Sequence, residues 1–262
     1  MDKINIGRIN MGQSSSISYS WRCVAITLDK KGKRFKSFLE NNNHLSISVF
    51  DGIKGSSLSN GEIISRGIAT EELVRSRLLS YGHVGCAVSH KIIWDKVAKG
   101  SEGCFVLEDD CYTHPKITEY ISNNLEVLMK IDICFFGINT NSIMKSVSPI
   151  GLTKICLFHP PHPSHEWIDN AFLKTNIRNI ELYKLIKAFG TCAYFITPHG
   201  AKKLSQQIFP LSLETTSIPL ITDQMVSFTI DRAGCRVYRK VDAYVCQPFL
   251  AYTPNLDSST NI

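Results

Sequence analysis

The sequence GCFVLEDD, residues 103–110, decides the fold. Its apolar run, residues 104–107, predicts a buried strand. Three acids follow the strand directly: Glu108, Asp109 and Asp110. In an open α/β sheet, ligands bind beyond the carboxyl ends of the strands, where we expect these acids to lie. Glu108 and Asp110 are alternate residues and can face one Mg²⁺ or Mn²⁺, because these ions prefer oxygen ligands. The competing interpretation is a solvated turn in which Asp109 or Asp110 caps the next helix.

Strands alternate with helices on both sides of this stretch. We expect strands at residues 21–28, 45–55, 104–110, 131–138, 193–197, 235–240 and 243–248. We expect helices at residues 29–43, 70–100, 117–130 and 198–208. The second helix should break near Gly82 and Gly85 and end at Gly100. This alternation predicts an α/β fold with a mostly parallel central sheet. We expect one domain, residues 21–262, after a loose leader at residues 1–20.

The composition is that of a globular protein with a mild positive charge. The chain has 262 residues, 44% of them hydrophobic and 20% charged, and a net charge of +6. This charge suits an anionic ligand or membrane surface, but no basic stripe with interleaved aromatic residues predicts nucleic-acid binding. Nine cysteines without a C-x-x-C pair indicate reduced thiols rather than a disulfide framework. We therefore expect a cytoplasmic protein without a signal peptide or membrane span.

Two neighbouring motifs carry a resemblance to a known family. The segment SYGHVGCAVSHKIIWDKV, residues 80–97, precedes GCFVLEDD by a short spacer. Together they resemble glycosyltransferase family 25, which includes bacterial lipooligosaccharide galactosyltransferases and collagen galactosyltransferases. The family's late Pro-Val-Asp is present only as PLITD, residues 219–223, and His83-Val84 replaces its usual Glu-Ile. The matching positions are Gly82, Gly85, Cys86, Ser89, His90, Trp94, Leu107, Glu108, Asp109 and Asp110.

The resemblance implies a GT-A-like nucleotide-sugar fold and an inverting transfer, often of galactose from UDP-galactose. It implies that Glu108 and Asp110 hold Mn²⁺ or Mg²⁺, while Asp109 contacts the metal, the ribose or the donor sugar. Such an ion stabilises the charge that develops on a diphosphate leaving group. The other donor contacts that we expect are Thr27, Leu28, Asp29, Arg34, Gly85 and Ser89.

Several of these positions have a plainer interpretation. Ser89 can bond a phosphate or its own helix backbone, and Gly85 can admit the donor or merely interrupt a helix. Asp223 is our candidate for the base that inversion requires, although it can equally cap a helix over QMVSFTI. His90 shares a helix face with Trp94, so it is either an active-site residue or a satisfied buried one. We assign Trp94 to the core.

A proline-rich segment, HPPHPSHEW, suggests a different kind of site. Polyproline II spacing would align His159, His162 and His165 on one edge, where they could bind a transition metal. We favour an acceptor-covering loop or surface variation, in which Glu166 and Trp167 contact sugar.

The sequence indicates a metal-dependent, inverting galactosyltransferase with a UDP-sugar donor and a lipooligosaccharide or other glycan acceptor. Alternatives are a nucleotidyltransferase that acts on a sugar phosphate and a catalytically silent sugar-nucleotide-binding module. Contact with the inner membrane surface would fit a glycolipid acceptor and a basic cluster. That cluster consists of Lys30, Lys31, Lys33, Arg34 and Lys36.

Overall fold

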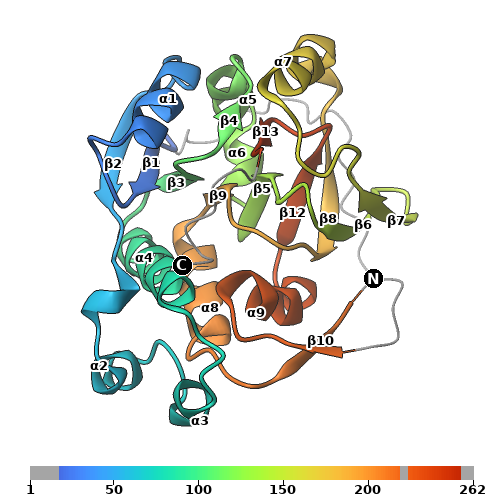
Figure 1. Cartoon of the computed structure of the whole chain (residues 1–262). Helices are drawn as coiled ribbons and strands as arrows, with labels where there is room; N and C mark the ends of the chain where they lie inside the picture. The colour runs from blue at the N-terminus through green and yellow to red at the C-terminus, as the bar shows by residue number, and fades with distance from the viewer. Residues whose placement is uncertain (1–17, 219–223, 255–262) are drawn as a thin grey trace.

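A nine-stranded mixed sheet forms the centre of the chain (Figure 1). The computed structural model describes residues 18–218 and 224–254. In order across the sheet, the strands are β2 (Ile47–Asp51), β1 (Trp21–Thr27), β3 (Gly103–Glu108), β9 (Ala193–Ile196), β5 (Ile133–Gly137), β12 (Ala243–Gln247), β8 (Glu181–Lys187), β6 (Ile143–Val147) and β7 (Thr153–Leu157).

Most strands of this sheet run in the same direction. β1 pairs in parallel with β2 and β3, and β5 pairs in parallel with β12. β9 lies antiparallel between β3 and β5, and the antiparallel strands β8, β6 and β7 follow β12. The α/β class is therefore confirmed, and the layout agrees with the GT-A-like fold that the resemblance implies. Two short pairs lie outside the main sheet: β4 (Tyr112–Thr113) with β13 (Ala251–Tyr252), and β10 (Thr215–Ser217) with β11 (Gln224–Val226).

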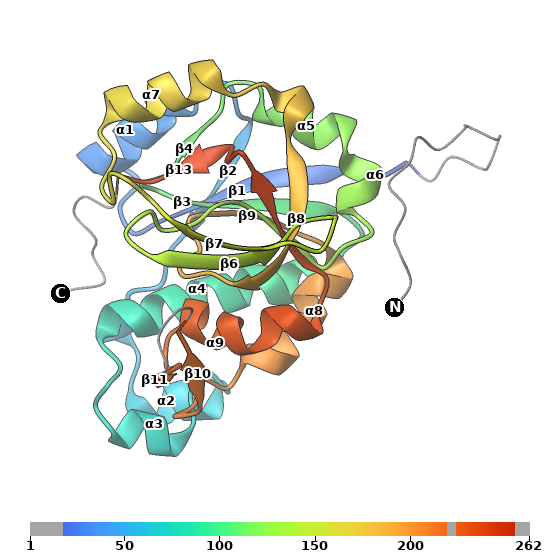
Figure 2. The same ribbon diagram turned by 90° about the vertical axis from the view of Figure 1, so that its right-hand side faces the viewer.

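Helices cover both faces of the sheet (Figure 2). One layer holds α1 (Lys33–Asn41), α5 (Ile117–Asn123), α6 (Leu125–Leu128) and α7 (His165–Lys174). The other holds α4 (Tyr81–Val97), α8 (Pro198–Ile208) and α9 (Ile230–Val237). The remaining helices are α2 (Asn60–Ser65), α3 (Glu71–Arg75) and the short 3₁₀ turns η1 (Gly55–Ser57), η2 (Ile177–Asn179) and η3 (Tyr238–Lys240).

β3 serves two cores because successive strand residues point to opposite faces. Phe105 and Leu107 pack in the core beneath α1 and α5. Cys104 and Val106 pack in the core beneath α4, α8 and α9. All four side chains are fully buried, which explains why this run is apolar at every position rather than alternating.

The break that we predicted near Gly82 and Gly85 is wrong, because both glycines lie inside α4. The chain interrupts its helix earlier, between α3 and α4. Ser80 then caps α4: its side chain accepts the backbone N–H of His83, and the His83 side chain accepts the backbone N–H of Ser80. Gly85 serves packing instead, since a Cβ there would lie 2.4 Å from the carbonyl oxygen of Ile53.

The strand that we predicted at residues 235–240 is also wrong. The segment forms the end of α9 followed by η3. Ile230, Ala233, Gly234 and Val237 are buried at helical spacing, so the apolar period of 3.6 begins upstream of the short alternating stretch. The hairpin of β6 and β7 and the strand β8 were not predicted.

All nine cysteines lie in the described residues and are free thiols. Within those residues, no helix is both long enough and apolar enough to cross a membrane.

Candidate functional site

A cavity of about 500 Å³ lies at the carboxyl ends of β1 and β3. The start of α1, the first half of α4 and the residues after β2 complete its walls. Of the residues predicted from the sequence, it brings together Thr27, Leu28, Asp29, Arg34, Gly85, Ser89, His90, Glu108 and Asp109. Asp110 lies directly behind this wall and does not line the cavity. Asp223 lies outside the described residues.

Arg34 provides the positive charge that faces the acids after β3. Its Nε lies 2.7 Å from Oδ1 of Asp109, and its Nη2 lies 3.3 Å from Oδ2 of Asp110. Arg34 is the second residue of α1, so the helix N-terminus approaches the same carboxylates. The guanidinium therefore joins the first helix to the end of the central strand.

Glu108 contacts a buried network of polar side chains. Its Oε1 accepts a 2.5 Å hydrogen bond from Thr191 Oγ1 and lies 3.3 Å from Nε2 of His90. Nδ1 of His90 lies 2.7 Å from the hydroxyl of Tyr194, which also accepts a hydrogen bond from Trp94 Nε1 at 2.8 Å. His90 is 1% exposed and Trp94 is 2% exposed.

For a neutral His90, the network selects the tautomer. The indole of Trp94 can only donate, so the Tyr194 oxygen is its acceptor and the Tyr194 hydroxyl proton is left for Nδ1 of His90. Nε2 of His90 then carries the ring proton and donates it toward Glu108. The helix face shared by His90 and Trp94 thus orients a carboxylate at the floor of the cavity.

The two metal-ligand candidates have pKa values shifted in opposite directions. Burial opposes ionisation of Glu108, but its hydrogen bonds to His90 and Thr191 and the charge of Arg34 hold its pKa below the ordinary value. Burial, followed by repulsion from Glu108, raises the pKa of Asp110 to about 6. Oδ1 of Asp110 is buried and has no hydrogen-bond partner among the described residues.

Cys86, His90 and Glu108 form the one group of three metal-ligating side chains that the described residues contain within 4.8 Å of one another. Burial, and then the Glu108 carboxylate, raise the pKa of the Cys86 thiol well above its ordinary value. A protonated thiol is a weak ligand, so the oxygen atoms of Glu108 and Asp110 are the harder donors beside the cavity.

The loop after β1 is held by its own side chains. Oγ1 of Thr27 accepts the backbone N–H of Asp29, and the Thr27 carbonyl accepts the backbone N–H of Gly52 at 2.7 Å. Oδ1 of Asp29 accepts the backbone N–H of Lys31 at 2.9 Å. These bonds form a turn that exposes Leu28 at the cavity wall.

Ser89 is satisfied by backbone groups on two elements. Its hydroxyl donates to the carbonyl of Gly85 at 2.7 Å and accepts the backbone N–H of Ile53 at 2.9 Å. It thereby fastens α4 to the loop after β2, and the absent side chain at Gly85 permits the close approach. A Cβ at Gly55 would meet the carbonyl of Tyr81 in the same way.

The sequence reasoning missed several residues of this site. Thr191 and Tyr194 lie in GTCAYFIT, where we predicted a strand at residues 193–197 but no site residue. Lys33 and Lys54 line the cavity, and neither ammonium group has a hydrogen bond or ion pair among the described residues. Lys54 follows the turn after β2, and the parallel pairing of β1 with β2 brings this turn to the cavity.

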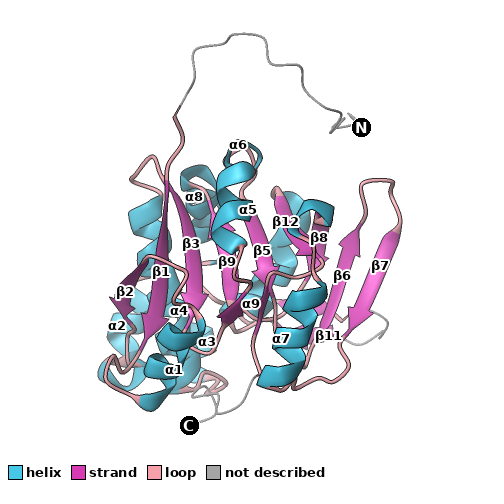
Figure 3. Ribbon diagram, turned by 90° about the horizontal axis from the view of Figure 1, so that it is seen from above, coloured by secondary structure: helices cyan, strands magenta, loops and turns pink. Residues whose placement is uncertain are grey.

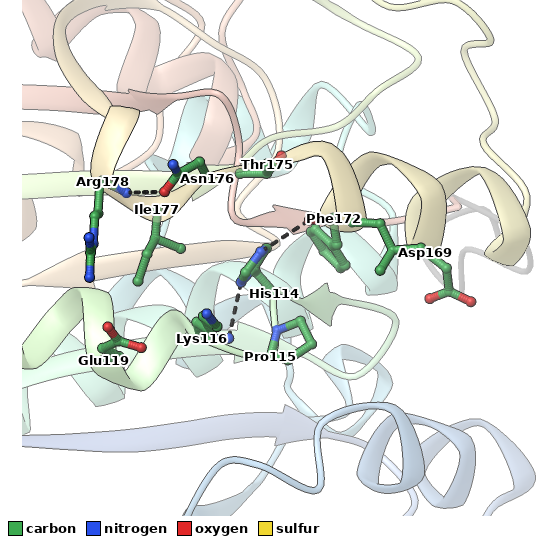
Figure 4. A pocket seen from close by; sticks show the side chains of 11 residues that line it. His114, Pro115, Lys116, Glu119, Asp169, Phe172, Thr175, Asn176, Ile177 and Arg178 are labelled. Atoms are coloured by element: carbon green, nitrogen blue, oxygen red, sulfur yellow. Dashed lines mark hydrogen bonds between the residues drawn. The ribbon is translucent and has the colours of Figure 1, made fainter.

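A second cavity, of about 720 Å³, lies between the start of α5 and the end of α7 (Figure 4). Buried His114 joins its two sides: Nδ1 accepts the backbone N–H of Lys116 at 3.0 Å, and Nε2 donates to the carbonyl of Phe172 at 3.2 Å. Burial lowers the pKa of His114.

Four charged side chains line this second cavity: Lys116, Glu119, Asp169 and Arg178. Their side chains form no hydrogen bond or ion pair within the described part of the chain. A cavity lined by two cations and two carboxylates is poorly matched to a ligand that carries charge of a single sign. Hydroxyl groups both donate and accept, so a polyhydroxyl ligand can satisfy both kinds of charge.

The three histidines of HPPHPSHEW do not form a metal-ligating group in the structure. Nδ1 of His162 lies 3.4 Å from the carbonyl oxygen of Pro254, whereas Nε2 of His165 lies 2.6 Å from the hydroxyl of Tyr112. His165 begins α7, which ends any polyproline alignment before it. Trp167 packs edge-on against Tyr252.

Comparison with known sequences agrees with the motifs at this site. The profile of "Glycosyltransferase family 25 (LPS biosynthesis protein)" matches residues 24–220. A "Glycosyltransferase 25 family member" from Aedes aegypti is 28% identical over 122 residues, which cover 43% of this chain and 20% of the relative. A protein of the same description from Anopheles gambiae is 24% identical over 192 residues, or 70% of this chain and 28% of the relative. The chain thus matches less than a third of the length of either relative. Because the profile covers most of the chain, including both central motifs, the protein belongs to glycosyltransferase family 25.

Proposed function

We propose that the protein is a metal-dependent, inverting glycosyltransferase that moves galactose from UDP-galactose to a lipooligosaccharide or another surface glycan. Family membership supports sugar transfer as the reaction class. The observation that carries the proposal is the cavity at the ends of β1 and β3, where carboxylates meet a guanidinium and two lysines without ion pairs.

Asp110 and Glu108 are the residues that would hold Mn²⁺ or Mg²⁺. A buried carboxylate oxygen without a partner is costly, and Oδ1 of Asp110 is such an atom. A divalent cation would satisfy it and lower the raised pKa of Asp110. When bound, the ion would supply positive charge to the diphosphate leaving group.

The cavity also offers cations of its own for the diphosphate. Lys33, Arg34 and Lys54 line it, and Arg34 is already aligned by Asp109. A guanidinium in this position can exchange the carboxylate for a phosphate group. The planar carboxylate and the tetrahedral phosphate both accept paired N–H groups from arginine. The turn at Thr27 to Asp29 would border the uridine.

We propose that the glycan acceptor extends toward the second cavity. Glu108 lines the first cavity and His114 lines the second, and six residues of chain reach at most about 22 Å. The mixed charges of the second cavity suit a neutral, hydroxyl-rich ligand. Asp223 stays our candidate for the base that takes the proton of the acceptor hydroxyl.

The proposal is tested with purified protein, UDP-galactose and Mn²⁺. We expect metal-dependent release of UDP, and a thermal shift with UDP that requires the metal. Asp110→Asn keeps the side-chain shape and should lower UDP release by roughly 100-fold. Asp95→Asn, at the other end of α4, is the control and should leave the rate unchanged.

Other results would assign another function. Release of pyrophosphate from a nucleotide and a sugar phosphate would support a nucleotidyltransferase. Binding of UDP-galactose without turnover, with or without a glycan acceptor, would support a silent binding module. Full activity of Asp110→Asn in excess chelator would contradict the metal assignment.

A further inference from the structure

The hairpin of β6 and β7 lies at one end of the sheet (Figure 3). It gathers exposed apolar side chains. Ile150 is 82% exposed, Leu152 is 59% exposed and Leu157 is 70% exposed. Exposed large hydrophobic residues on a soluble protein are normally scattered singly, whereas a gathered group marks an interaction surface.

The strand register extends this patch along one face of the hairpin. Residues directly opposite each other in an antiparallel pair lie on the same face. Ile143 pairs with Leu157 and Lys145 pairs with Ile155. Together with the remaining pair of that face, they form what we call the outer hairpin face: Ile143, Lys145, Val147, Thr153, Ile155 and Leu157. None of these six side chains is buried.

The other face of the hairpin belongs to the core. Met144 and Ser146 alternate with the outer residues and are 1% and 0% exposed. Cys156, opposite Met144, packs against the same core. The inner face therefore fixes the hairpin on the sheet, so the outer face cannot turn inward to bury its apolar side chains.

The turn presents its apolar residues in a fixed conformation. The backbone N–H of Ser148 donates to the carbonyl of Leu152 at 2.8 Å, and the N–H of Leu152 donates to Oγ of Ser148 at 3.0 Å. Gly151 has φ +87° and closes the turn by donating to the carbonyl of Ser148. Ile150 and Leu152 thus project from an ordered tip.

The charged residues of the hairpin itself have one sign. Residues 133–165, which include the whole hairpin, contain no Asp or Glu. Lys145 lies on the outer hairpin face, and Lys187 lies opposite it on β8. The ammonium of Lys145 has no hydrogen bond or ion pair among the described residues. An apolar hairpin surface whose only charged residues are cations is complementary to anionic lipid headgroups above acyl chains.

We propose that the outer hairpin face, with Ile150 and Leu152 at its tip, is a contact surface for an anionic lipid bilayer. The tip enters the interface, and Lys145 lies among the headgroups. This inference goes beyond sugar transfer and locates membrane contact away from the basic cluster at α1. In that cluster, Lys30 is paired with Asp51 and Arg34 with Asp109.

A second copy of the chain is a poorer occupant of the same surface. Packing two outer hairpin faces together would enclose the Lys145 side chains of both copies. The hairpin offers no acid to pair with them, and an enclosed cation without a partner is costly. A bilayer with anionic lipids provides the missing negative charge.

Co-sedimentation with vesicles tests the inference directly, without donor or acceptor. The intact protein is mixed with vesicles of phosphatidylglycerol and phosphatidylcholine in equal parts, and with vesicles of phosphatidylcholine alone. We expect binding to the anionic vesicles that weakens as salt is raised. Ile150→Glu combined with Leu152→Glu should reduce the partition coefficient at least tenfold, and Lys145→Glu should reduce it several-fold. Val127→Glu, an exposed apolar position on α6, should leave it unchanged.

Each contrary result would overturn the inference. Equal binding of both vesicle types would remove the role of charge, and undiminished binding of the tip variant would remove the role of the hairpin. A concentration-dependent dimer that the tip variant abolishes, without vesicle binding by the intact protein, would identify a second copy as the occupant. Thermal unfolding of each variant verifies that it is folded. Because no turnover is measured, failure here is distinct from failure of the proposed function.

Discussion

Arg34 and Asp109 join the two segments that border the first cavity, with Nε of the guanidinium 2.7 Å from Oδ1 of the carboxylate. Arg34 begins α1, whereas Asp109 follows β3, so the contact unites residues 75 positions apart in the sequence. The guanidinium also approaches Asp110, whose other carboxylate oxygen has no partner among the described residues. Arg34 is therefore the counter-ion for two adjacent acids.

Arg34→Ala should destabilise the metal-free protein and increase its response to metal. Without the guanidinium, Asp109 and Asp110 repel each other in a partly buried place. We expect a loss of about 1–2 kcal/mol in the free energy of unfolding, measured with urea in excess chelator. Mn²⁺ should then raise the melting temperature of the variant by more than it raises that of the wild type.

Lys30→Ala is the matched control, because it breaks the exposed ion pair of Lys30 with Asp51. An exposed pair of this kind contributes little, so the change should stay within about 0.5 kcal/mol. Equal metal responses in wild type and Arg34→Ala would show that the guanidinium and the metal do not compete for the same charges.

Tyr194→Phe should separate Trp94 from the His90–Glu108 pair. The substitution removes a buried hydroxyl and leaves Trp94 Nε1 without its acceptor and His90 Nδ1 without its donor. We expect a loss of about 1–3 kcal/mol in unfolding free energy, together with weaker metal-dependent binding of UDP in a thermal-shift titration.

Tyr120→Phe provides the comparison for this prediction. Tyr120 is also buried, at 4% exposed, but its hydroxyl forms no hydrogen bond among the described residues. Its loss should change stability by less than half as much. If Tyr194→Phe lowered stability yet left UDP binding intact, the network would be structural only and would not position Glu108.

The strand that carries the acids could be predicted because its signal is local. Residues 104–107 are apolar at every position, and their carboxyl end is marked by charge. The pairing of Arg34 with Asp109 depends on the parallel register of β1 with β3, which no local pattern encodes. The contact of Thr191 with Glu108 could not be predicted for the same reason. It depends on β9 inserting antiparallel beside β3, which no local pattern encodes.

The errors have a similar origin. Residues 235–240 alternate in polarity over a window too short to distinguish a strand from the end of an amphipathic helix. We interpreted Gly85 as a residue that admits the donor or interrupts a helix. Its missing side chain instead admits the backbone of Ile53 within an unbroken helix. Packing overrode propensity at that position.

His114 should make the stability of the fold depend on pH. Burial lowers its pKa, the charge of Lys116 lowers it further, and hydrogen bonds to the carbonyls of Phe172 and Thr175 oppose the shift. The ordinary value of 6.5 applies to the unfolded chain. Below pH 6.5 the unfolded chain binds a proton that the folded protein resists, so stability is complete above that pH and declines as pH falls.

His44 and His83 also have lowered pKa values and contribute to the pH dependence of wild-type stability. His114→Gln removes only the titrating group at position 114, so the difference between variant and wild type isolates the effect of His114. Urea unfolding of both proteins should give curves that converge as pH falls below 6.5. The difference in slope should be at most about 1.4 kcal/mol per pH unit. Parallel curves would contradict a neutral His114 in the folded state.

Arg178→Glu should impair use of the acceptor more than use of the donor. Arg178 lies on η2 and lines the second cavity, across from Glu119 on α5 (Figure 4). Reversing its charge leaves three carboxylates around Lys116 and removes a donor for acceptor hydroxyls. The KM for a lipooligosaccharide acceptor should rise roughly tenfold, equivalent to about 1.4 kcal/mol, whereas the KM for UDP-galactose should change far less.

Lys174→Glu reverses a charge on the last turn of α7 that does not line the cavity and should leave both constants unchanged. If both variants raised the acceptor KM equally, the effect would be a general electrostatic one. Only a direct contact with the acceptor can make Arg178, which lines the cavity, differ from Lys174, which does not.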